Sequence, residues 1–397
     1  MSTIEQFLTS WRPALVDFRR DLHAHPELGR AETRTTDRIA ELLRGAGLTP
    51  QLLPTGTGLL CDIGSSPTVG LRGDIDALPL NDVKAVSYRS TVPGVCHACG
   101  HDVHTTVVAG AGVYLAGLAA EGKLARGVRL IFQPAEELMP GGALDVIAAG
   151  GLDGLERLYA VHCDPAVSAG QVGLRVGAVT SATDLVSVVL SGSGGHTARP
   201  QLTADLVTAL GDVIVSVPQI LARRVDPRAG VNLVWGEVRA GTAANVIPRT
   251  GTLSGTLRML DRAAWEAMPA LLDEVVRAVA APYGVEVELS HQRGVPPVVN
   301  DVAAVAELTS AAVSWIGPDS VTSTEQSLGG EDFGWMLEKV PGALVRLGVR
   351  PPGAEMAADL HQAGFDVDER CIEVGVRLLA GAVLGADRER RYDPAGG

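Results

Sequence analysis

Short apolar runs alternate with longer amphipathic segments along the first half of the chain. Apolar positions recur at helical spacing over 4–20 and 33–46, and Gly47 then supplies a helix-ending signal. Compact apolar runs bounded by Gly, Ser or Pro predict strands. These runs are 58–63, 68–71, 128–132 and 158–162, with a helix of small residues expected over 105–120. Strands that alternate with helices predict an α/β sheet with helices on its faces.

The order of elements changes near residue 183. The pattern predicts strands over 184–190, 231–238, 250–260 and 285–290, with helices over 204–223 and 262–280. This β-α-β-β-α-β order is the ferredoxin-like unit, which can form a domain by itself. Helical and strand-like segments resume after Pro296-Pro297. We therefore expect an α/β domain formed by 1–182 and 297–397, with a ferredoxin-like α+β domain of 183–296 inserted into it.

Composition narrows the class of protein. The 397 residues are too many for one ordinary core, and 46% hydrophobic with 20% charged residues is typical of a globular chain. The net charge of −13, without basic runs, argues against a nucleic-acid partner. We expect neither a signal peptide nor a membrane span, because the start lacks a basic and apolar leader and no apolar run is long enough. Five cysteines, an odd number, favour a reducing cytoplasm over a disulfide scaffold.

The densest group of metal-ligand side chains is the segment 96–104, which holds two cysteines, three histidines and an aspartate. Thiolate, imidazole and carboxylate are the ligands of zinc and related metals. Cys99 and His101 flank Gly100 just before a predicted helix whose first turn would hold Asp102, and a turn at this place would hold a ligand pair rigidly. Three alternatives to a catalytic metal site stand here: inert buried thiols, a dithiol redox site at Cys96-x-x-Cys99, and a structural zinc site, which lacks a second Cys/His pair.

Further ligand-type side chains follow predicted strands. Glu136 and Glu137 come directly after the strand 128–132, and adjacent carboxylates point in different directions, so one can bind a metal while the other acts as general base. His162 ends the strand 158–162, and His361 lies in a loop near the C-terminus. A solvated acidic loop and two hydrogen-bonded core histidines are the plainer interpretations. Ligands at the carboxyl ends of several strands nevertheless fit the usual place of active sites in open α/β sheets.

Seven segments, in chain order, carry a resemblance to a known family. They are His-Ala-His-Pro-Glu-Leu at 23–28, Leu-Arg-Gly-Asp-Ile-Asp-Ala-Leu-Pro at 71–79, His-Ala-Cys-Gly-His-Asp at 97–102, Phe-Gln-Pro-Ala-Glu-Glu at 132–137, Gly-Gly-His-Thr-Ala-Arg-Pro at 194–200, Asn-Val-Ile-Pro at 245–248 and Glu-Asp-Phe at 331–333. The chain resembles the dinuclear-metal aminoacylase and carboxypeptidase-G-like metallopeptidases. The closest branch contains hippurate hydrolases, auxin-conjugate hydrolases and N-acetyl-diaminopimelate deacetylases. The resemblance covers nearly the whole chain and implies a mixed-sheet catalytic domain with an inserted dimerisation and lid domain.

The resemblance also implies roles for individual residues. It makes Glu136 the general base and Asp76 the carboxylate that orients a ligand. A cysteine stands where relatives use a bridging aspartate, and thiolate is softer than carboxylate, so metal preference is expected to differ. Cys96 replaces the family's usual hydrophobic residue and has no assigned role. The implied ligands of two divalent ions (Zn, Mn, Co or Ni, with no choice fixed) are Cys99, His101, Glu137, His162 and His361.

The inserted domain adds three polar residues. In the resembling family, the histidine of the Gly-Gly-His motif reaches a neighbouring subunit's active site and helps to polarise the substrate carbonyl. This implies that role for His196, with Asn245 as a second polar contact and a homodimer or higher homo-oligomer. Arg258, in the strand 250–260, is a candidate for binding a substrate carboxylate. The plainer interpretations are a surface loop and a solvated strand arginine.

The resulting prediction is a cytoplasmic amidohydrolase with two metal ions. It cleaves the amide bond of a small-molecule N-acyl amino acid and releases a carboxylic acid and a free amino acid. A dipeptidase or carboxypeptidase on the same scaffold is the first alternative, and a metal-binding or redox protein that uses Cys96 and Cys99 is the second. The preferred acyl group, the preferred amino acid and the native metal are not fixed by the sequence.

Overall fold

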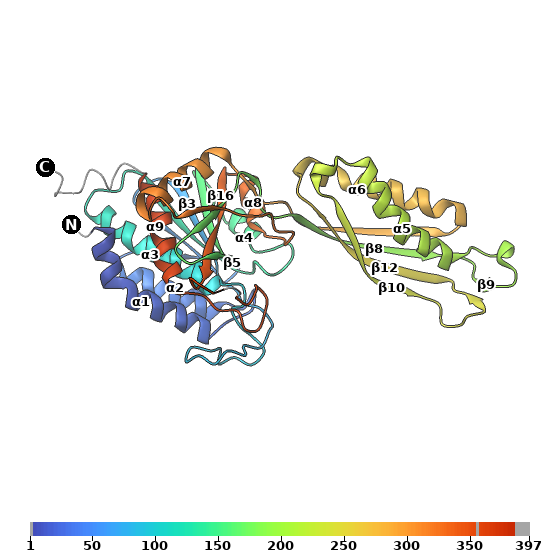
Figure 1. The fold of residues 1–397 in the computed structure, drawn as a ribbon, viewed down its shortest axis with the longest axis horizontal. Helices are drawn as coiled ribbons and strands as arrows, with labels where there is room; N and C mark the ends of the chain where they lie inside the picture. Colours follow the sequence, from blue (N-terminus) through green and yellow to red (C-terminus); the bar gives the residue numbers. More distant parts are fainter. Residues whose placement is uncertain (1–2, 355–356, 386–397) are drawn as a thin grey trace. The chain divides into compact units, whose positions relative to one another are not determined.

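The computed structural model describes residues 3–354 and 357–385, and the chain forms two compact units (Figure 1). Unit 1 comprises Met1–Gly177, Val299–Glu325 and Trp335–Gly397, and unit 2 comprises Ala178–Val298 and Gln326–Gly334. Short elements lie where the chain passes from one unit to the other, namely β7 (Gly177–Ala178), β14 (Val299–Asn300) and α8 (Phe333–Leu337). The sequence had placed the inserted domain at 183–296.

Unit 1 contains a mixed eight-stranded sheet in the described residues, in the order β1-β2-β4-β3-β5-β16-β6-β15. β3 runs parallel to β4 and β5, and β5 runs parallel to β16, while β2 pairs antiparallel with β4. The predicted α/β class is therefore confirmed. The strands are β1 (Gln51–Leu52), β2 (Leu59–Ile63), β3 (Pro67–Asp74), β4 (Gly127–Gln133), β5 (Arg157–Ser168), β6 (Val172–Leu174), β15 (Val321–Ser323) and β16 (Gly342–Arg350).

The helix α3 is the centre of the helical layer of unit 1, in contact with α1, α9 and β3. It begins at His101, so Asp102 lies in its first turn as expected, because Gly100 takes a left-handed backbone (φ 87°) and lets the chain turn into the helix there. Its small residues permit close packing: a Cβ added to Gly112 would lie 2.3 Å from Leu130. The helices are α1 (Ile4–Ala24), α2 (Thr33–Gly45), α3 (His101–Ala120), α4 (Ala143–Ala148), α7 (Val302–Trp315) and α9 (Arg370–Leu384).

Unit 2 has the predicted β-α-β-β-α-β order. Its antiparallel sheet has the strand order β10-β12-β8-β13, which is the ferredoxin-like arrangement. The indole of Trp265 donates to the buried Asp184 at 2.9 Å and so joins α6 to β8. The elements are β8 (Ala182–Ser191), β9 (Gly195–His196), α5 (Leu206–Arg224), β10 (Asn232–Ala240), β11 (Val246–Ile247), β12 (Thr250–Met259), α6 (Arg262–Ala280) and β13 (Glu286–Val295), with 3-10 turns at Pro200–Leu202, Pro227–Ala229 and Ala281–Tyr283.

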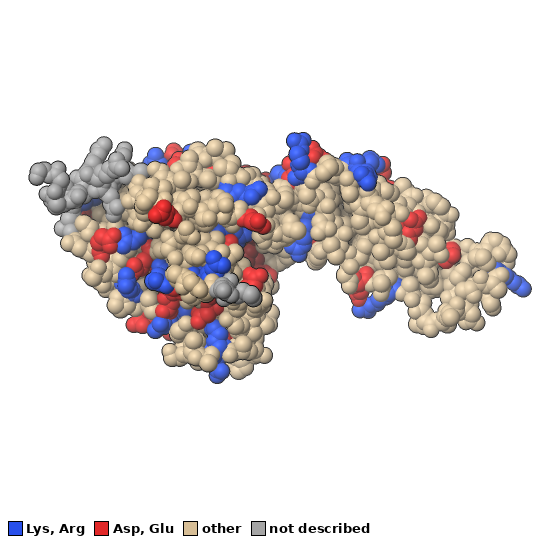
Figure 2. Space-filling model, viewed as in Figure 1, with Lys and Arg blue, Asp and Glu red and all other residues tan. Residues whose placement is uncertain are grey.

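The surface of unit 1 carries both signs of charge. Figure 2 shows acidic and basic side chains interspersed over the face in view. Two helices, α3 and α5, are long and apolar enough to cross a membrane by length and composition alone. In α3, 78% of the apolar window is buried inside the protein, as in the core helix of a globular domain.

Candidate metal centre and active site

Two aspartates lie at the carboxyl end of β3 and begin the site: Asp74 is its last residue, and Asp76 follows it. Asp74 and Asp76 are both buried. Arg72 donates to Asp74 at 2.7 Å, and Nδ1 of His104 lies 2.6 Å from the other carboxylate oxygen. Nε2 of His104 accepts the backbone N–H of Cys163 at 2.7 Å. Both ring nitrogens of His104 are therefore engaged, and this histidine supports the site and leaves no nitrogen free for a metal.

Asp76 orients two other residues of the site. One carboxylate oxygen lies 3.2 Å from Nδ1 of His101, and the other accepts the backbone N–H of Glu137 at 3.0 Å. A carboxylate at Nδ1 keeps the proton there, so the lone pair of Nε2 points away from Asp76, as in other carboxylate-supported metal ligands. That Nε2 is buried and has no hydrogen-bond partner among residues 3–354 and 357–385. It lies 3.8 Å from Glu136 and 3.9 Å from Glu137.

Cys99 and His162 meet on the other side of His101. The sulfur of Cys99 lies 3.5 Å from Nε2 of His162, and Nδ1 of His162 lies 2.8 Å from the carbonyl oxygen of Cys163. That carbonyl fixes the proton on Nδ1, which leaves Nε2 with a lone pair toward the thiol. Burial raises the pKa of the Cys99 thiol, and burial lowers the pKa of His162 well below its usual range, with His104 and Arg346 adding to the effect.

His361 approaches from the loop before α9. Its backbone is left-handed (φ 61°), an uncommon conformation for a residue with a side chain. Its N–H donates to the carbonyl of Ala98 at 2.8 Å, which joins this loop to the Cys99 turn. Nε2 lies 3.2 Å from Glu137. Contacts with Cys99 and Glu137 raise the pKa of His361 to about 10, so these side chains together stabilise positive charge.

The predicted ligands form two triads that share Cys99. The ligand atoms of Cys99, His101 and His162 lie within 4.8 Å of one another, and so do those of Cys99, Glu137 and His361. Glu136 belongs to neither triad but lies within the same distance of His101 and Glu137. The residues fit a pair of cations, because Nε2 of His101 is buried, has no hydrogen-bond partner in the part of the chain that the structure describes, and lies 3.9 Å from a carboxylate oxygen of Glu137. Thiolate, imidazole and carboxylate form a donor set for divalent transition metals.

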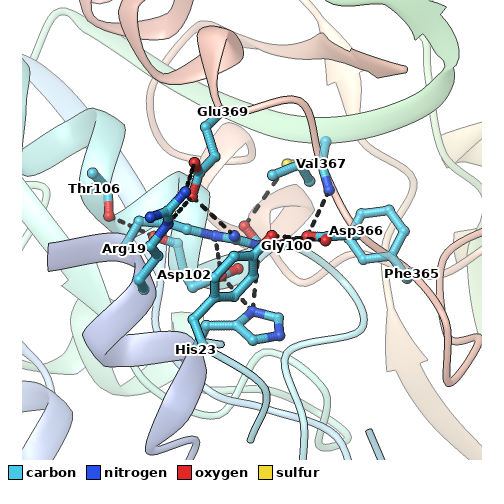
Figure 3. A network of polar contacts seen from close by, with 12 residues as sticks. Arg19, His23, Gly100, Asp102, Thr106, Phe365, Asp366, Val367 and Glu369 are labelled. Carbon is cyan, nitrogen blue, oxygen red and sulfur yellow. Dashed lines mark hydrogen bonds and ion pairs between the residues drawn. The ribbon is translucent and has the colours of Figure 1, made fainter. Parts of the chain in front are cut away.

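A second network, made of buried ion pairs around Arg19, contacts the segments that carry the ligands (Figure 3). The guanidinium of Arg19, on α1, lies 2.7 Å from Asp102, 3.2 Å from Asp366 and 3.4 Å from Glu369. Asp102 directly follows His101, and Asp366 lies in the same loop as His361. Burial alone would lower the pKa of Arg19, but the carboxylates raise it above its usual value, so this charge is firmly held. Arg19 thereby joins the two segments that carry ligands.

The three predicted residues of the inserted domain all lie in unit 2. His196 and Asn245 are exposed and come together where β9 pairs with β11. Nδ1 of His196 accepts the N–H of Ala198 at 3.0 Å, so Nε2 carries the proton and is a donor. Arg258 lies near the opposite end of the sheet, where it pairs with Thr183 on β8, and donates to the carbonyl of Leu328.

Sequence reasoning did not assign roles to Arg72, Asp74, His104, Arg19 or Arg346. Asp74 and Arg72 lie inside a motif that carried the resemblance, and His104 lies inside the Cys/His segment, so the types of residue were visible. The partners of these residues were not visible in the sequence. His104, for example, forms hydrogen bonds with Asp74 and Cys163, which are 30 and 59 residues away along the chain. Arg346 lies between the apolar residues Val345 and Leu347 of β16 and had no signal beyond its charge.

Comparison with known proteins places the chain in a family. A family model described as peptidase family M20/M25/M40 matches residues 70–385, and the chain belongs to that family. The N-acetylcysteine deacetylase of Bacillus subtilis is 34% identical over 92% of this chain and 95% of its own length. A Rhodococcus jostii protein named putative glutamate–cysteine ligase 2-3 is 48% identical over 92% of the chain, but the chain spans only 46% of that protein.

A solved structure agrees with this placement. The YXEP protein of Bacillus subtilis, described as a dinuclear metal binding peptidase from the M20 family, superposes with a TM-score of 0.82 at 32% identity. The match covers 95% of this chain and 98% of that one. The predicted family and fold are thus confirmed, and so is the predicted class of enzyme, a metal-dependent hydrolase of amide bonds.

Proposed function

We propose that the protein hydrolyses N-acyl amino acids at a centre of two divalent metal ions and releases a carboxylic acid and a free amino acid. The observation that carries the proposal is the pair of ligand triads that share Cys99, with Glu136 beside them and outside both. The deacetylase from Bacillus subtilis supports the substrate class, since its name describes removal of an acyl group from an amino acid.

The ligands divide between the two triads. Cys99, His101 and His162 would hold one ion, and Cys99, Glu137 and His361 would hold the other. Divalent ions bound there would supply Lewis acidity, which lowers the pKa of water and polarises the scissile carbonyl. Zn, Mn, Co and Ni are the candidates, and the shared thiolate favours the softer ions among them. Asp76 would hold His101 in the tautomer that presents Nε2 to the centre.

Glu136 is the proposed general base. Its carboxylate lies 3.8 Å from Nε2 of His101, which places it at the edge of the centre. The preceding residue, Ala135, has a left-handed backbone (φ 54°), and this turn lets neighbouring carboxylates of Glu136 and Glu137 face different parts of the site. Glu136 would take a proton from the attacking water and deliver it to the nitrogen of the leaving amine.

His196, Asn245 and Arg258 are the proposed substrate contacts from unit 2. The N–H at Nε2 of His196 suits stabilisation of the oxyanion that forms on the scissile carbonyl. Asn245 lies beside it and offers a second donor. Arg258 has one terminal nitrogen engaged by Leu328 and Thr183, and its others are the proposed contact for a substrate carboxylate.

A homodimer in the cytoplasm completes the proposal. The resemblance implies that His196 acts in a neighbouring subunit, which requires at least a dimer. The strand β10 supports this assembly, because in the described residues it is an edge strand that pairs with β12 alone, and its side chains Val234 and Val238 are 52% and 56% exposed. The acidic net charge of −13 favours a small-molecule substrate over nucleic acid.

A hydrolysis panel tests the proposal. The metal-free protein is reconstituted with Zn, Mn, Co or Ni and assayed on N-acetyl amino acids, N-benzoyl amino acids and dipeptides. We expect turnover of N-acyl amino acids that disappears on chelation and returns with metal. Preference for dipeptides would support the dipeptidase alternative instead. A reversible Cys96–Cys99 disulfide in a protein that binds no metal would support the redox alternative and contradict the proposal.

A further inference from the structure

The turn at Ala135 decides where the two adjacent carboxylates of the site point. Ala135 is buried, lies just beyond the end of β4 and directly precedes Glu136. Its left-handed backbone (φ 54°) is uncommon for a residue with a side chain, and such a conformation persists where neighbouring groups hold it. The carbonyl of Ala135 accepts the N–H of Gly142 at 3.0 Å. Its own N–H is therefore the second point at which the turn can be held.

Two buried carboxylates bind the backbone on either side of Glu136. Glu32, which is fully buried, accepts the N–H of Ala135 at 2.7 Å. Asp76 accepts the N–H of Glu137 at 3.0 Å. Hydrogen bonds that are shielded from water are strong and keep their partners in a fixed geometry. The chain before and after Glu136 is thus anchored at two points, one of which is Glu32.

The side chain of Glu32 serves this turn and not its own helix. Glu32 is the N-cap residue of α2, a position from which acidic side chains often cap the helix. In the described part of the chain, Glu27 caps this helix instead. The two carboxylate oxygens of Glu27 accept the N–H groups of Arg34 and Thr35 at 3.1 and 2.7 Å. The carboxylate of Glu32 is therefore available to reach Ala135, which follows it by 103 positions.

The segment that carries Glu32 packs directly on the turn. A Cβ added to Gly29 would lie 3.2 Å from the Cα of Ala135. Burial raises the pKa of Glu32, and the charge of Asp76 adds to the effect. A raised pKa favours the neutral carboxyl group, whose carbonyl oxygen still accepts an N–H. An amide should therefore replace Glu32 well, whereas an apolar side chain would leave the N–H of Ala135 buried without its acceptor.

We propose that Glu32 is a positioning residue for Glu136, because its hydrogen bond to Ala135 sets the direction in which the general base leaves the backbone. This inference rests on the proposed function, in which Glu136 takes a proton from the attacking water. A general base acts only within hydrogen-bond reach of the proton that it removes, and a displacement of about 1 Å can lower the rate roughly 100-fold. Glu137 keeps its own bond to Asp76, so the loss of Glu32 should affect turnover more than metal binding.

Three substitutions test the proposal. Glu32→Met keeps the length of the side chain but removes the acceptor, so kcat for the best N-acyl amino acid of the panel should fall about 10- to 100-fold. KM should change less than about threefold, and the metal content should equal that of the wild type. Glu32→Gln keeps the acceptor and should recover most of the loss. Glu27→Met, the matched control, removes the cap of α2 and should lower stability without lowering kcat.

A double-mutant cycle shows whether Glu32 acts through Glu136. In a protein that already carries Glu136→Gln, adding Glu32→Met should lower kcat by less than about threefold, because no base remains to be misplaced. Equal losses of kcat in the two backgrounds would overturn the inference. So would an unchanged kcat in the single variant Glu32→Met, or a loss of metal that accounts for its loss of turnover.

Hydrogen exchange separates this inference from the proposed function. A wild type that hydrolyses none of the panel would refute the proposed function. The exchange rate of the Ala135 amide does not depend on activity, and it should be about tenfold faster in Glu32→Met than in the wild type, with Glu32→Gln close to the wild type. Equal exchange rates in all three proteins would show that Glu32 does not hold the turn, and would refute its positioning role independently.

Discussion

The sulfur of Cys99 lies 3.5 Å from Nε2 of His162, and the same sulfur belongs to the triad formed with Glu137 and His361. One side chain is therefore common to both halves of the proposed centre. This relationship depends on the turn at Gly100, where a Cβ would lie 2.6 Å from the sulfur of Cys163. The absence of a side chain at this position lets the ligand turn approach β5 closely enough for Cys99 and His162 to meet.

Replacing the shared thiol should affect both metal ions at once. Cys99→Ala removes a ligand from each triad, so we expect fewer than one ion per chain where the wild type binds two, with a loss of affinity above the roughly 10- to 100-fold caused by removing a supporting partner. Cys96→Ala is the control, since Cys96 is buried but belongs to neither triad. Metal analysis of the dialysed variants measures the effect. Equal retention of metal by both variants would remove Cys99 from the centre.

The neighbouring arginines Arg19 and Arg20 should differ in their contribution to stability. Arg19 is 1% exposed and faces the buried Asp102, whereas the side chain of Arg20 is 41% exposed and faces Glu369. Arg19→Met leaves Asp102 without its cation and should lower the free energy of unfolding by about 3–5 kcal/mol. Arg20→Met should cost about 0–1 kcal/mol. Both guanidinium groups lie near the ring of Tyr88, at 4.9 and 5.0 Å, so this contact is lost equally. Urea denaturation compares the two variants, and similar losses would contradict the assignment.

Glu32 should make the stability of the protein depend on pH. Its carboxylate is buried and accepts the N–H of Ala135 at 2.7 Å, and burial raises its pKa in the folded state. A raised pKa means that the folded state holds the proton more tightly than the unfolded state does. The stabilisation is complete below the unfolded pKa of about 4.3 and is lost as the pH rises through the folded value.

The substitution Glu32→Gln isolates this effect. The amide has nearly the same shape, can accept the same N–H and does not ionise. Its stability relative to the wild type should therefore increase from pH 4 upward, by about 1.4 kcal/mol for each unit by which the folded pKa exceeds the unfolded one, and then level off. Thermal unfolding of both proteins across this pH range measures the difference. A constant difference at every pH would show that Glu32 does not titrate differently in the two states.

Much of the architecture follows from local pattern. The helix over 262–280 was predicted with the bounds that the structure gives it, and the ferredoxin-like order followed from the spacing of apolar runs. The pattern of small residues marks α3 only from 105, because the buried first turn at 101–104 consists of His, Asp, Val and His. Apolar periodicity cannot report a buried helical face built from histidine, aspartate and threonine.

The site was predictable in its residue types and much less so in its contacts. Cys99, His101 and the Glu136-Glu137 pair carry motifs that can be read from the chain. The buried ion pairs that support the ligand segments form only when distant parts of the chain meet. Arg19, for example, contacts Asp102 and Asp366, which follow it by more than 80 and 340 positions.

The most direct test of the central claim is Glu136→Gln. The amide keeps the size of the side chain but cannot take a proton, and Glu136 lies outside both ligand triads. The variant should bind two metal ions per chain as the wild type does, and its kcat for an N-acyl amino acid should fall by about 100- to 10,000-fold. Metal content and kcat are measured on the same preparation. A variant with full metal content and wild-type turnover would contradict the account.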